Sequence, residues 1–218
     1  MRALFFIILL LSGFSIFSFK SFEFRLLTAG FSWTMSKLLP YITLVIEGIL
    51  LAYLFAKGFK IKTKVAKMLV LLVLFAAPFT TGFVLNPIYE GDFSSEGSAA
   101  VSDKVKLDEK YDLLVITIPG CPYCLASIEQ LKIIKKRTPN AHILFSVCSK
   151  EKRDLELYRT LIDGKFDIAL AADLEASVKL AEGHFPTSVQ IKKGLPVQKW
   201  SNDQFGAGAM DHFESEVK

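Results

Sequence analysis

The residues of this chain best suited to chemistry are two cysteines separated by two positions, Cys121 and Cys124. They lie between an apolar run at 112–118, typical of a strand, and a run at 122–137, typical of a helix. A thiol at a helix N-terminus lies near unpaired N–H groups and the helix dipole, which can lower its pKa from about 8.5. We therefore predict a dithiol/disulfide oxidoreductase in which Cys121 is the attacking thiolate and Cys124 the resolving thiol.

The alternative for these two cysteines is one half of a zinc site. Zinc usually takes four ligands, and the sequence has neither a second cysteine pair nor a histidine pair at ligand spacing. We therefore expect no metal and no cofactor. The third cysteine, Cys148, ends an apolar run at 142–147; a small core side chain is the expectation, and an additional redox partner is the alternative.

The elements that must position the cysteines follow from the pattern after residue 103. Apolar stretches of strand length alternate with stretches of helix length, and alternating elements imply an α/β sheet. We expect strands at 112–118, 142–148 and near 166–170, helices at 122–137, 153–162, 173–182 and near 207–215, and a hairpin made from 188–191 and 197–200.

The step Phe185-Pro186-Thr187 opens this hairpin some sixty residues after the cysteine pair. A CxxC after the first strand, an x-Pro-Thr step before a hairpin and a terminal helix together resemble the thioredoxin superfamily. The CPYC sequence itself resembles glutaredoxins. The resemblance implies a thioredoxin-like fold in which Pro186 is cis and packs beside the cysteines. The alternative is an ordinary trans proline at the start of a strand.

The same resemblance implies which residues would bind a substrate peptide. Phe185 would present its backbone to the peptide, and the other expected contacts come from Pro186, Thr187, Pro122 and Tyr123.

Two positions depart from the thioredoxin pattern. Val115 stands where thioredoxins carry a buried aspartate, and Gly120 stands where a tryptophan commonly precedes the first cysteine. Because no glutathione-binding pattern is evident either, the sequence leaves the direction of the redox reaction open.

The first part of the chain has the composition of a membrane region. Three apolar runs, Met1–Phe19, Leu38–Ala56 and Met68–Leu85, have about the length that spans a hydrocarbon core. We expect an α-helical transmembrane region of about three spans. The alternative for the first run is a cleaved signal peptide, although it lacks a clear small-x-small cleavage site.

The charge distribution predicts the orientation in the membrane. Five lysines lie in the short stretch 57–67 between the second and third runs, whereas residues 68–103 contain no lysine or arginine. By the positive-inside rule the lysine loop is cytoplasmic. We therefore place the chain in the bacterial inner membrane with the redox domain on the periplasmic side. The inverted topology, a cytosolic glutaredoxin-like reductase, is the alternative.

The net charge of +4 gives no reason to expect a nucleic-acid partner. Residues 103–218 carry 17 basic and 17 acidic side chains, so the whole excess belongs to the membrane part. An excess of positive charge that is confined to the membrane part indicates how the chain is oriented in the membrane.

The membrane part also has a resemblance of its own. Ser12-Gly13, Phe22-Glu23, Ala29-Gly30-Phe31 and Glu47 resemble the MauE/DoxX group of small membrane proteins, over roughly residues 1–80. Members of that group usually have four helices, one more than we expect here. Glu47 lies within an apolar run, and an intramembrane carboxylate is often functional; the alternative is a structural carboxylate paired with Arg25 or Lys37.

These observations combine into one organisation: a transmembrane helical region at 1–85, a flexible linker at 86–102 and a thioredoxin-like redox domain at 103–218. We expect a membrane-anchored thiol-disulfide oxidoreductase whose partners are extracytoplasmic proteins with thiols or disulfides, the lipid bilayer and an unknown electron donor or acceptor. The alternative function is a non-enzymatic assembly factor that holds client thiols or metal.

Overall fold

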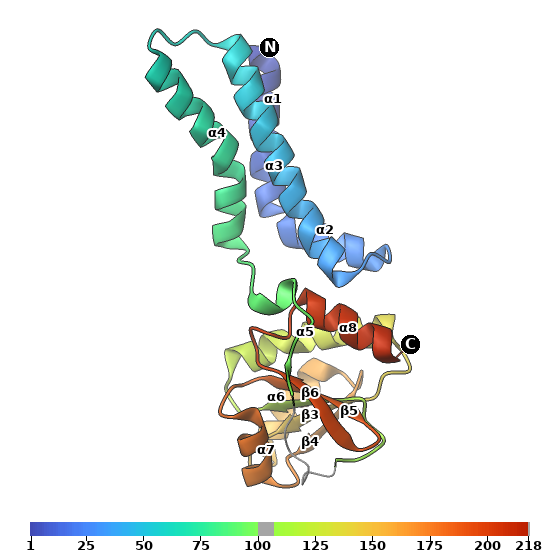
Figure 1. The fold of residues 1–218 in the computed structure, drawn as a ribbon. Coiled ribbons are helices and arrows are strands. Elements are labelled where there is room, and N and C mark those ends of the chain that lie inside the picture. Colours follow the sequence, from blue (N-terminus) through green and yellow to red (C-terminus); the bar gives the residue numbers. More distant parts are fainter. Residues whose placement is uncertain (100–106, 218) are drawn as a thin grey trace. The chain divides into compact units, whose positions relative to one another are not determined.

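The computed structural model describes residues 1–99 and 107–217, and the chain divides into two compact units, Met1–Ile88 and Tyr89–Lys218 (Figure 1). The last residues of the predicted linker, 100–102, and the first of the predicted redox domain, 103–106, lie outside the described residues. The predicted boundary at 103 falls among these residues, and both boundaries, at 85 and 103, stay predictions.

The first unit consists of apolar helices. They are α1 (Arg2–Phe17), α2 (Phe19–Thr28), α3 (Trp33–Gly58) and α4 (Lys64–Leu85). At 1.5 Å per residue, α3 and α4 are about 39 and 33 Å long, enough to cross a hydrocarbon core of about 30 Å. The described residues hold two helices that qualify as spans, or three if α1 and α2, which meet at a 68° bend, count as one.

Helices α3 and α4 pack closely against each other at two glycines. A Cβ on Gly48 would lie 2.2 Å from the Phe75 carbonyl oxygen, and a Cβ on Gly82 would lie 2.3 Å from Leu44 Cδ1. Small residues at such positions let membrane helices pack tightly. The outer surface is apolar, with Leu10, Phe17 and Val84 among the most exposed side chains. This unit therefore suits a lipid environment.

The second unit is an α/β domain built on one mixed sheet. Its elements are η1 (Glu90–Asp92), β1 (Ser98–Ala99), β2 (Leu113–Thr117), α5 (Pro122–Arg137), β3 (Ile143–Val147), α6 (Arg153–Ile162), β4 (Asp167–Leu170), α7 (Leu174–Ala181), β5 (Thr187–Lys192), β6 (Leu195–Trp200) and α8 (Ala207–Val217). The strand order is β1-β6-β5-β2-β3-β4. Strands β2, β3 and β4 are parallel, and β5, β6 and β1 continue the sheet in antiparallel pairs.

Strand β2 lies at the centre of this sheet, with β3 on one side and β5 on the other. All five of its residues are buried, which explains why the sequence there is a continuous apolar run without polar alternation. Leu114 and Ile116 pack in one cluster with Leu180 of α7 and Val189 of β5. The predicted fold class, apolar helices followed by a thioredoxin-like α/β domain, is confirmed.

Residues 89–99, which the sequence analysis placed in a flexible linker, form η1 and β1 of the second unit (Figure 1). Strand β1 pairs with β6, and Trp200 Nε1 donates to the Ser95 carbonyl over 3.3 Å. Asp92 accepts a hydrogen bond from Ala207 N at the start of α8, at 3.3 Å. The glycines and serines that suggest flexibility here instead allow close packing.

Glycine-to-backbone contacts hold this segment 89–99. A Cβ on Gly91 would lie 1.9 Å from the Gln204 carbonyl oxygen, and one on Gly208 would lie 2.7 Å from the Ser94 carbonyl oxygen. Gly91 N also donates to the Asp203 carbonyl at 3.0 Å. Any larger residue at these points would push the segment away from the domain.

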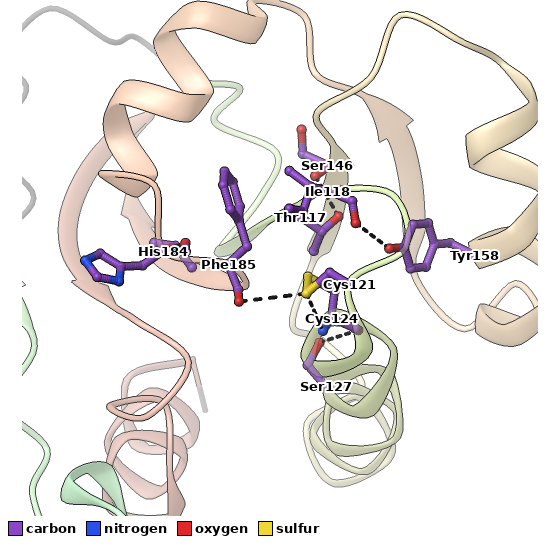
Figure 2. The surroundings of a disulfide bond; sticks show 10 residues. Thr117, Ile118, Cys121, Cys124, Ser127, Ser146, Tyr158, His184 and Phe185 are labelled. Atoms are coloured by element: carbon purple, nitrogen blue, oxygen red, sulfur yellow. Dashed lines mark hydrogen bonds between the residues drawn. A yellow bond between two sulfur atoms is a disulfide. The ribbon is translucent and has the colours of Figure 1, made fainter.

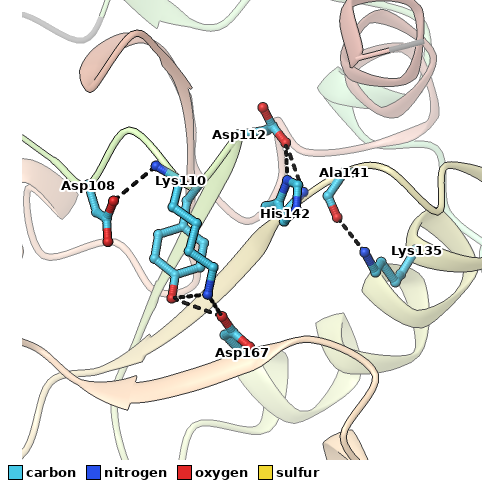
Figure 3. Close-up of polar contacts among 8 residues, drawn as sticks. Asp108, Lys110, Asp112, Lys135, Ala141, His142 and Asp167 are labelled. Atoms are coloured by element: carbon cyan, nitrogen blue, oxygen red, sulfur yellow. Dashed lines mark hydrogen bonds and ion pairs between the residues drawn. The ribbon is translucent and has the colours of Figure 1, made fainter.

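Exposed polar groups surround the start of β2 (Figure 3). Lys110 Nζ lies 2.6 Å from Asp167 Oδ2, and the Tyr111 hydroxyl donates to the same oxygen at 2.9 Å. The hydrogen bond from Lys110, followed by that from Tyr111, lowers the pKa of Asp167. Asp112 Oδ2 accepts from His142 N at 2.8 Å. These contacts link the beginnings of β2, β3 and β4.

Candidate active site

The two cysteines form a disulfide at the point where the chain passes from β2 into α5 (Figure 2). Cys121 precedes the first helical residue, and its sulfur accepts a hydrogen bond from Cys124 N at 3.1 Å. Pro122 occupies the first helical position, where its missing N–H leaves no bond unmade. A thiolate at Cys121 would be stabilised by this N–H and by the helix dipole.

The two sulfurs differ in access. Cys121 is 9% exposed and Cys124 is 0% exposed. Pro122 and Tyr123, between them, are exposed, the latter by 63%. A partner protein can therefore reach the surface formed by Pro122 and Tyr123 and the small exposed part of Cys121, whereas Cys124 is completely covered. This arrangement suits the roles predicted for the two thiols.

The loop before β5 faces the disulfide. The Phe185–Pro186 peptide bond is cis, which confirms the prediction made for Pro186. The Phe185 carbonyl oxygen lies 3.8 Å from Cys121 Sγ (Figure 2). In the disulfide Cys121 has no proton to donate, so this is a contact; after reduction the thiol can donate to that carbonyl.

Thr187, the third residue of this step, is turned inward. Its hydroxyl donates to the His184 carbonyl at 2.5 Å, and the residue pairs with Ile116 of β2. The pairing ties the proline loop to the strand that leads to Cys121. Figure 2 shows the His184 ring pointing away from the disulfide. Phe185 therefore lies at the site, while Thr187 supports the loop through its hydroxyl and its pairing with β2. The predicted packing of Pro186 beside the cysteines stays a prediction.

Val115 and Cys148, two further positions considered in the sequence, lie in the interior. Val115 is fully buried and cannot exchange a proton with Cys124. Cys148 is a buried free thiol in the cluster that includes Leu114 and Ile116, and burial raises its pKa. It is the small core side chain that the sequence suggests. Among the described residues, no three His, Cys, Asp or Glu side chains group together as metal ligands.

Two residues at the site were not singled out by the sequence. The Tyr158 hydroxyl of α6 donates to the Ile118 carbonyl at 2.6 Å, and Ser127 Oγ donates to the Cys124 carbonyl at 2.9 Å (Figure 2). Ser127 follows Cys124 by one helical turn. Tyr158 comes from a different element, and only the packing of α6 brings it to this loop.

Glu47, the candidate of the membrane part, belongs to the first unit. Its Oε1 accepts a hydrogen bond from Ser15 Oγ of α1 at 2.6 Å. Its Oε2 is buried without a hydrogen-bond partner. A role for Glu47 stays a prediction.

Comparison with known proteins gives distant likenesses of fold. No protein-family model matches the sequence, and no curated protein matches it. One similar structure is the thioredoxin domain of a thiol-disulfide oxidoreductase from Bacteroides vulgatus, at 16% identity and a TM-score of 0.41, covering 50% of this chain and 81% of that one.

Two further structures are similar at the same level. A secreted Mycobacterium tuberculosis disulfide oxidoreductase, described as homologous to Escherichia coli DsbE, shares 16% identity at a TM-score of 0.40, over 56% of this chain and 92% of that one. A thioredoxin-like protein from Bacteroides caccae shares 15% identity at a TM-score of 0.35, over 84% and 82%. The chemistry of the site therefore rests on its own geometry.

Proposed function

We propose that this protein is a membrane-anchored thiol-disulfide oxidoreductase that acts on extracytoplasmic proteins through Cys121 and Cys124. The observation that carries the proposal is the disulfide at the start of α5, with the slightly exposed Cys121 against the Phe185 carbonyl and Cys124 completely buried. A dithiol in this position can form a mixed disulfide at one sulfur and resolve it with the other.

In the reductive direction, the Cys121 thiolate attacks a client disulfide. A Cys121–client S–S bond forms, the client bond breaks, and the leaving client thiolate takes a proton from solvent. Cys124 then loses its proton and attacks Cys121, which restores the disulfide and releases the second client thiol. The client gains two electrons and two protons, and the protein loses them. Oxidation of a client dithiol is the same sequence reversed.

A second partner must restore the starting redox state of Cys121 and Cys124. The first unit contains no cysteine, so it cannot pass electrons by thiol exchange. The partner is therefore a dithiol or disulfide protein, or a non-thiol carrier of two electrons. The proposal includes the similarity of the membrane part to MauE/DoxX proteins and a functional role for Glu47 within that part.

The orientation proposed is a redox domain on the periplasmic side of a bacterial inner membrane. Arg2 Nε donates to the Gly58 carbonyl at 3.0 Å, so the start of α1 and the end of α3 lie together beside the lysine-rich stretch 57–67. Only α4 separates that stretch from the second unit along the chain. If the lysine loop is cytoplasmic, one crossing by α4 delivers the second unit to the other side.

Replacement of Cys124 tests the function. In the full chain expressed in bacterial cells, Cys124→Ser should accumulate mixed disulfides between Cys121 and client proteins, visible on non-reducing gels and lost with dithiothreitol. Cys148→Ser is the matched control and should accumulate none. The proposal fails if Cys124→Ser gives no adducts, or if the adducts persist when Cys121 is also replaced.

Cys124→Ser also distinguishes the oxidoreductase from the alternative function, an assembly factor. An assembly factor that holds metal would lose bound metal on Cys124→Ser and would trap no protein. For the orientation, a reporter that is active only in the periplasm, fused after Lys218, should be active; an active cytosolic reporter at the same place would establish the inverted topology.

A further inference from the structure

The loop between β2 and α5 fixes where the reactive sulfur lies. Residues 119 and 120 form a turn, and Gly120 has a φ of +72°, a left-handed conformation that glycine adopts without strain. Cys121 follows this turn and caps α5. A small change in the turn therefore moves the Cys121 sulfur relative to Cys124 N, 3.1 Å away, and the Phe185 carbonyl, 3.8 Å away.

Tyr158 is the side chain that contacts this turn from another element. It is completely buried, and its ring packs against Phe145 of β3 with the centroids 5.1 Å apart. Ile162, one turn further along α6, is buried on the same face. The ring is thus held by the core, and its hydroxyl reaches the Ile118 carbonyl at 2.6 Å (Figure 2).

The hydroxyl is protonated as well as buried. Burial raises the pKa of Tyr158, so the group stays a neutral phenol that can donate to the Ile118 carbonyl. Ile118 directly precedes the turn at 119 and 120. A buried phenol that donates to the backbone differs from a tyrosine that merely fills space, because a phenylalanine would pack equally well without a polar group to satisfy.

We propose that Tyr158 is a positioning residue for the dithiol: its hydroxyl holds the Ile118 carbonyl at the beginning of the turn and so sets the place of the Cys121 sulfur at the start of α5. This inference rests on the proposed function. Tyr158 acts on the sulfur through the turn and takes no part in bond exchange. Without the hydroxyl, the turn is free to shift and the Cys121 thiolate loses part of the stabilisation given by Cys124 N–H and the helix dipole.

The test is the pH dependence of Cys121 alkylation in the reduced full chain, followed by mass spectrometry of the Cys121 peptide. Only the thiolate reacts, so the midpoint reports the Cys121 pKa. We expect Tyr158→Phe to raise the midpoint by about half to one pH unit, so that the rate at any pH below both midpoints falls roughly threefold to tenfold. At a pH above both midpoints the reduction potential should become more negative by about 15–30 mV, because the reduced form loses thiolate stabilisation of the same size in a two-electron couple.

Tyr111→Phe is the matched control. It removes a hydroxyl that donates to Asp167 at 2.9 Å, at the start of β2 and not at the end that leads to Cys121. It should leave the midpoint and the potential unchanged. Gly120→Ala is a second perturbation of the turn; the added Cβ meets no atom within 4 Å, so it acts through backbone strain alone, and we expect the same upward shift.

The outcomes separate this inference from the function on which it rests. A wild-type protein with no reversible couple would overturn the proposed function. A normal wild-type couple with Tyr158→Phe indistinguishable from Tyr111→Phe would overturn the inference alone. A Tyr158→Phe protein that is less stable to heat but has an unchanged midpoint would also overturn it, since the hydroxyl would then support only the fold.

Discussion

The two units differ in where their large apolar side chains lie, but both use glycines to bring backbone segments close together. In the first unit large apolar side chains face outward, and Phe17 is 87% exposed; in the second, large apolar side chains such as Phe145 and Trp200 are completely buried. Yet both units bring backbones together at glycines, Gly48 in one and Gly91 in the other. The contrast separates the two units: the second contains all three cysteines, and the first has the apolar surface that suits lipid.

The largest effect should come from removing the accessible sulfur. Cys121→Ser leaves no thiol that a client can reach, because Cys124 is covered. We expect exchange with a model protein disulfide to fall at least about a hundredfold in the full chain. Cys148→Ser should retain the activity. Appreciable exchange by Cys121→Ser would mean that the chemistry is not confined to the site described.

The next effect concerns the stability of the second unit. Gly91→Ala places a Cβ against the Gln204 carbonyl, and overpacking of this kind costs about 1–3 kcal/mol. Segment 89–99 should loosen, and the amides of β6 and α8 should exchange with deuterium faster. Glu90→Ala, an exposed neighbour, should change little. Equal exchange in the two variants would indicate that the segment does not support the domain.

A matched change in the first unit sharpens the comparison. Gly48→Ala places a Cβ 2.2 Å from the Phe75 carbonyl oxygen, whereas Gly13→Ala meets nothing within 4 Å. We expect the detergent-solubilised chain to lose thermal stability with Gly48→Ala only. The reduction potential should be the same in both variants. A shifted potential would show that the helices do more than anchor the domain.

The smallest effect is expected at the start of β2. Interaction with Lys110 and Tyr111 lowers the pKa of Asp167. Its contribution to stability is therefore present above about pH 4, the ordinary range of an aspartate, and is lost as the pH falls through the lowered value. The pair is exposed, so Asp167→Asn should lower the melting temperature by no more than about 2 °C at pH 7.

That difference should shrink as the pH falls below the ordinary aspartate range, and it should also shrink in 1 M salt, where exposed charges are screened. Thermal unfolding at two pH values and two salt concentrations checks both. A larger loss that persists in acid would mean that Asp167 acts through packing rather than charge.

Patterns local in sequence predicted most of the site and the order of elements. The strand before Cys121, the helix after it and the cis Pro186 follow from spacing or from the thioredoxin resemblance, because each depends on neighbouring residues. Tyr158 could not be found in that way. Its contact with Ile118, 40 residues away, exists only because α6 packs against β3.

Composition alone did not predict the structure of residues 89–99 or of the run Met1–Phe19. Glycine and serine at 89–99 suggest a flexible chain, but glycine equally permits the close backbone contacts seen at Gly91. The apolar run Met1–Phe19 suggests one straight span, whereas α1 ends at Phe17 and α2 continues after a 68° bend. Hydropathy reports which residues prefer lipid and does not report where a helix bends.

The most direct test of the central claim is the reduction potential of the Cys121–Cys124 couple in the full chain, equilibrated in glutathione buffers. Acid quenching, unfolding and thiol tagging should give three tags per chain when reduced and one, on Cys148, when oxidised. We expect a reversible two-electron transition between about −270 and −120 mV, the range of thioredoxin-like reductants and oxidants. A protein that carries three tags or one tag at every buffer ratio in that range would contradict the account.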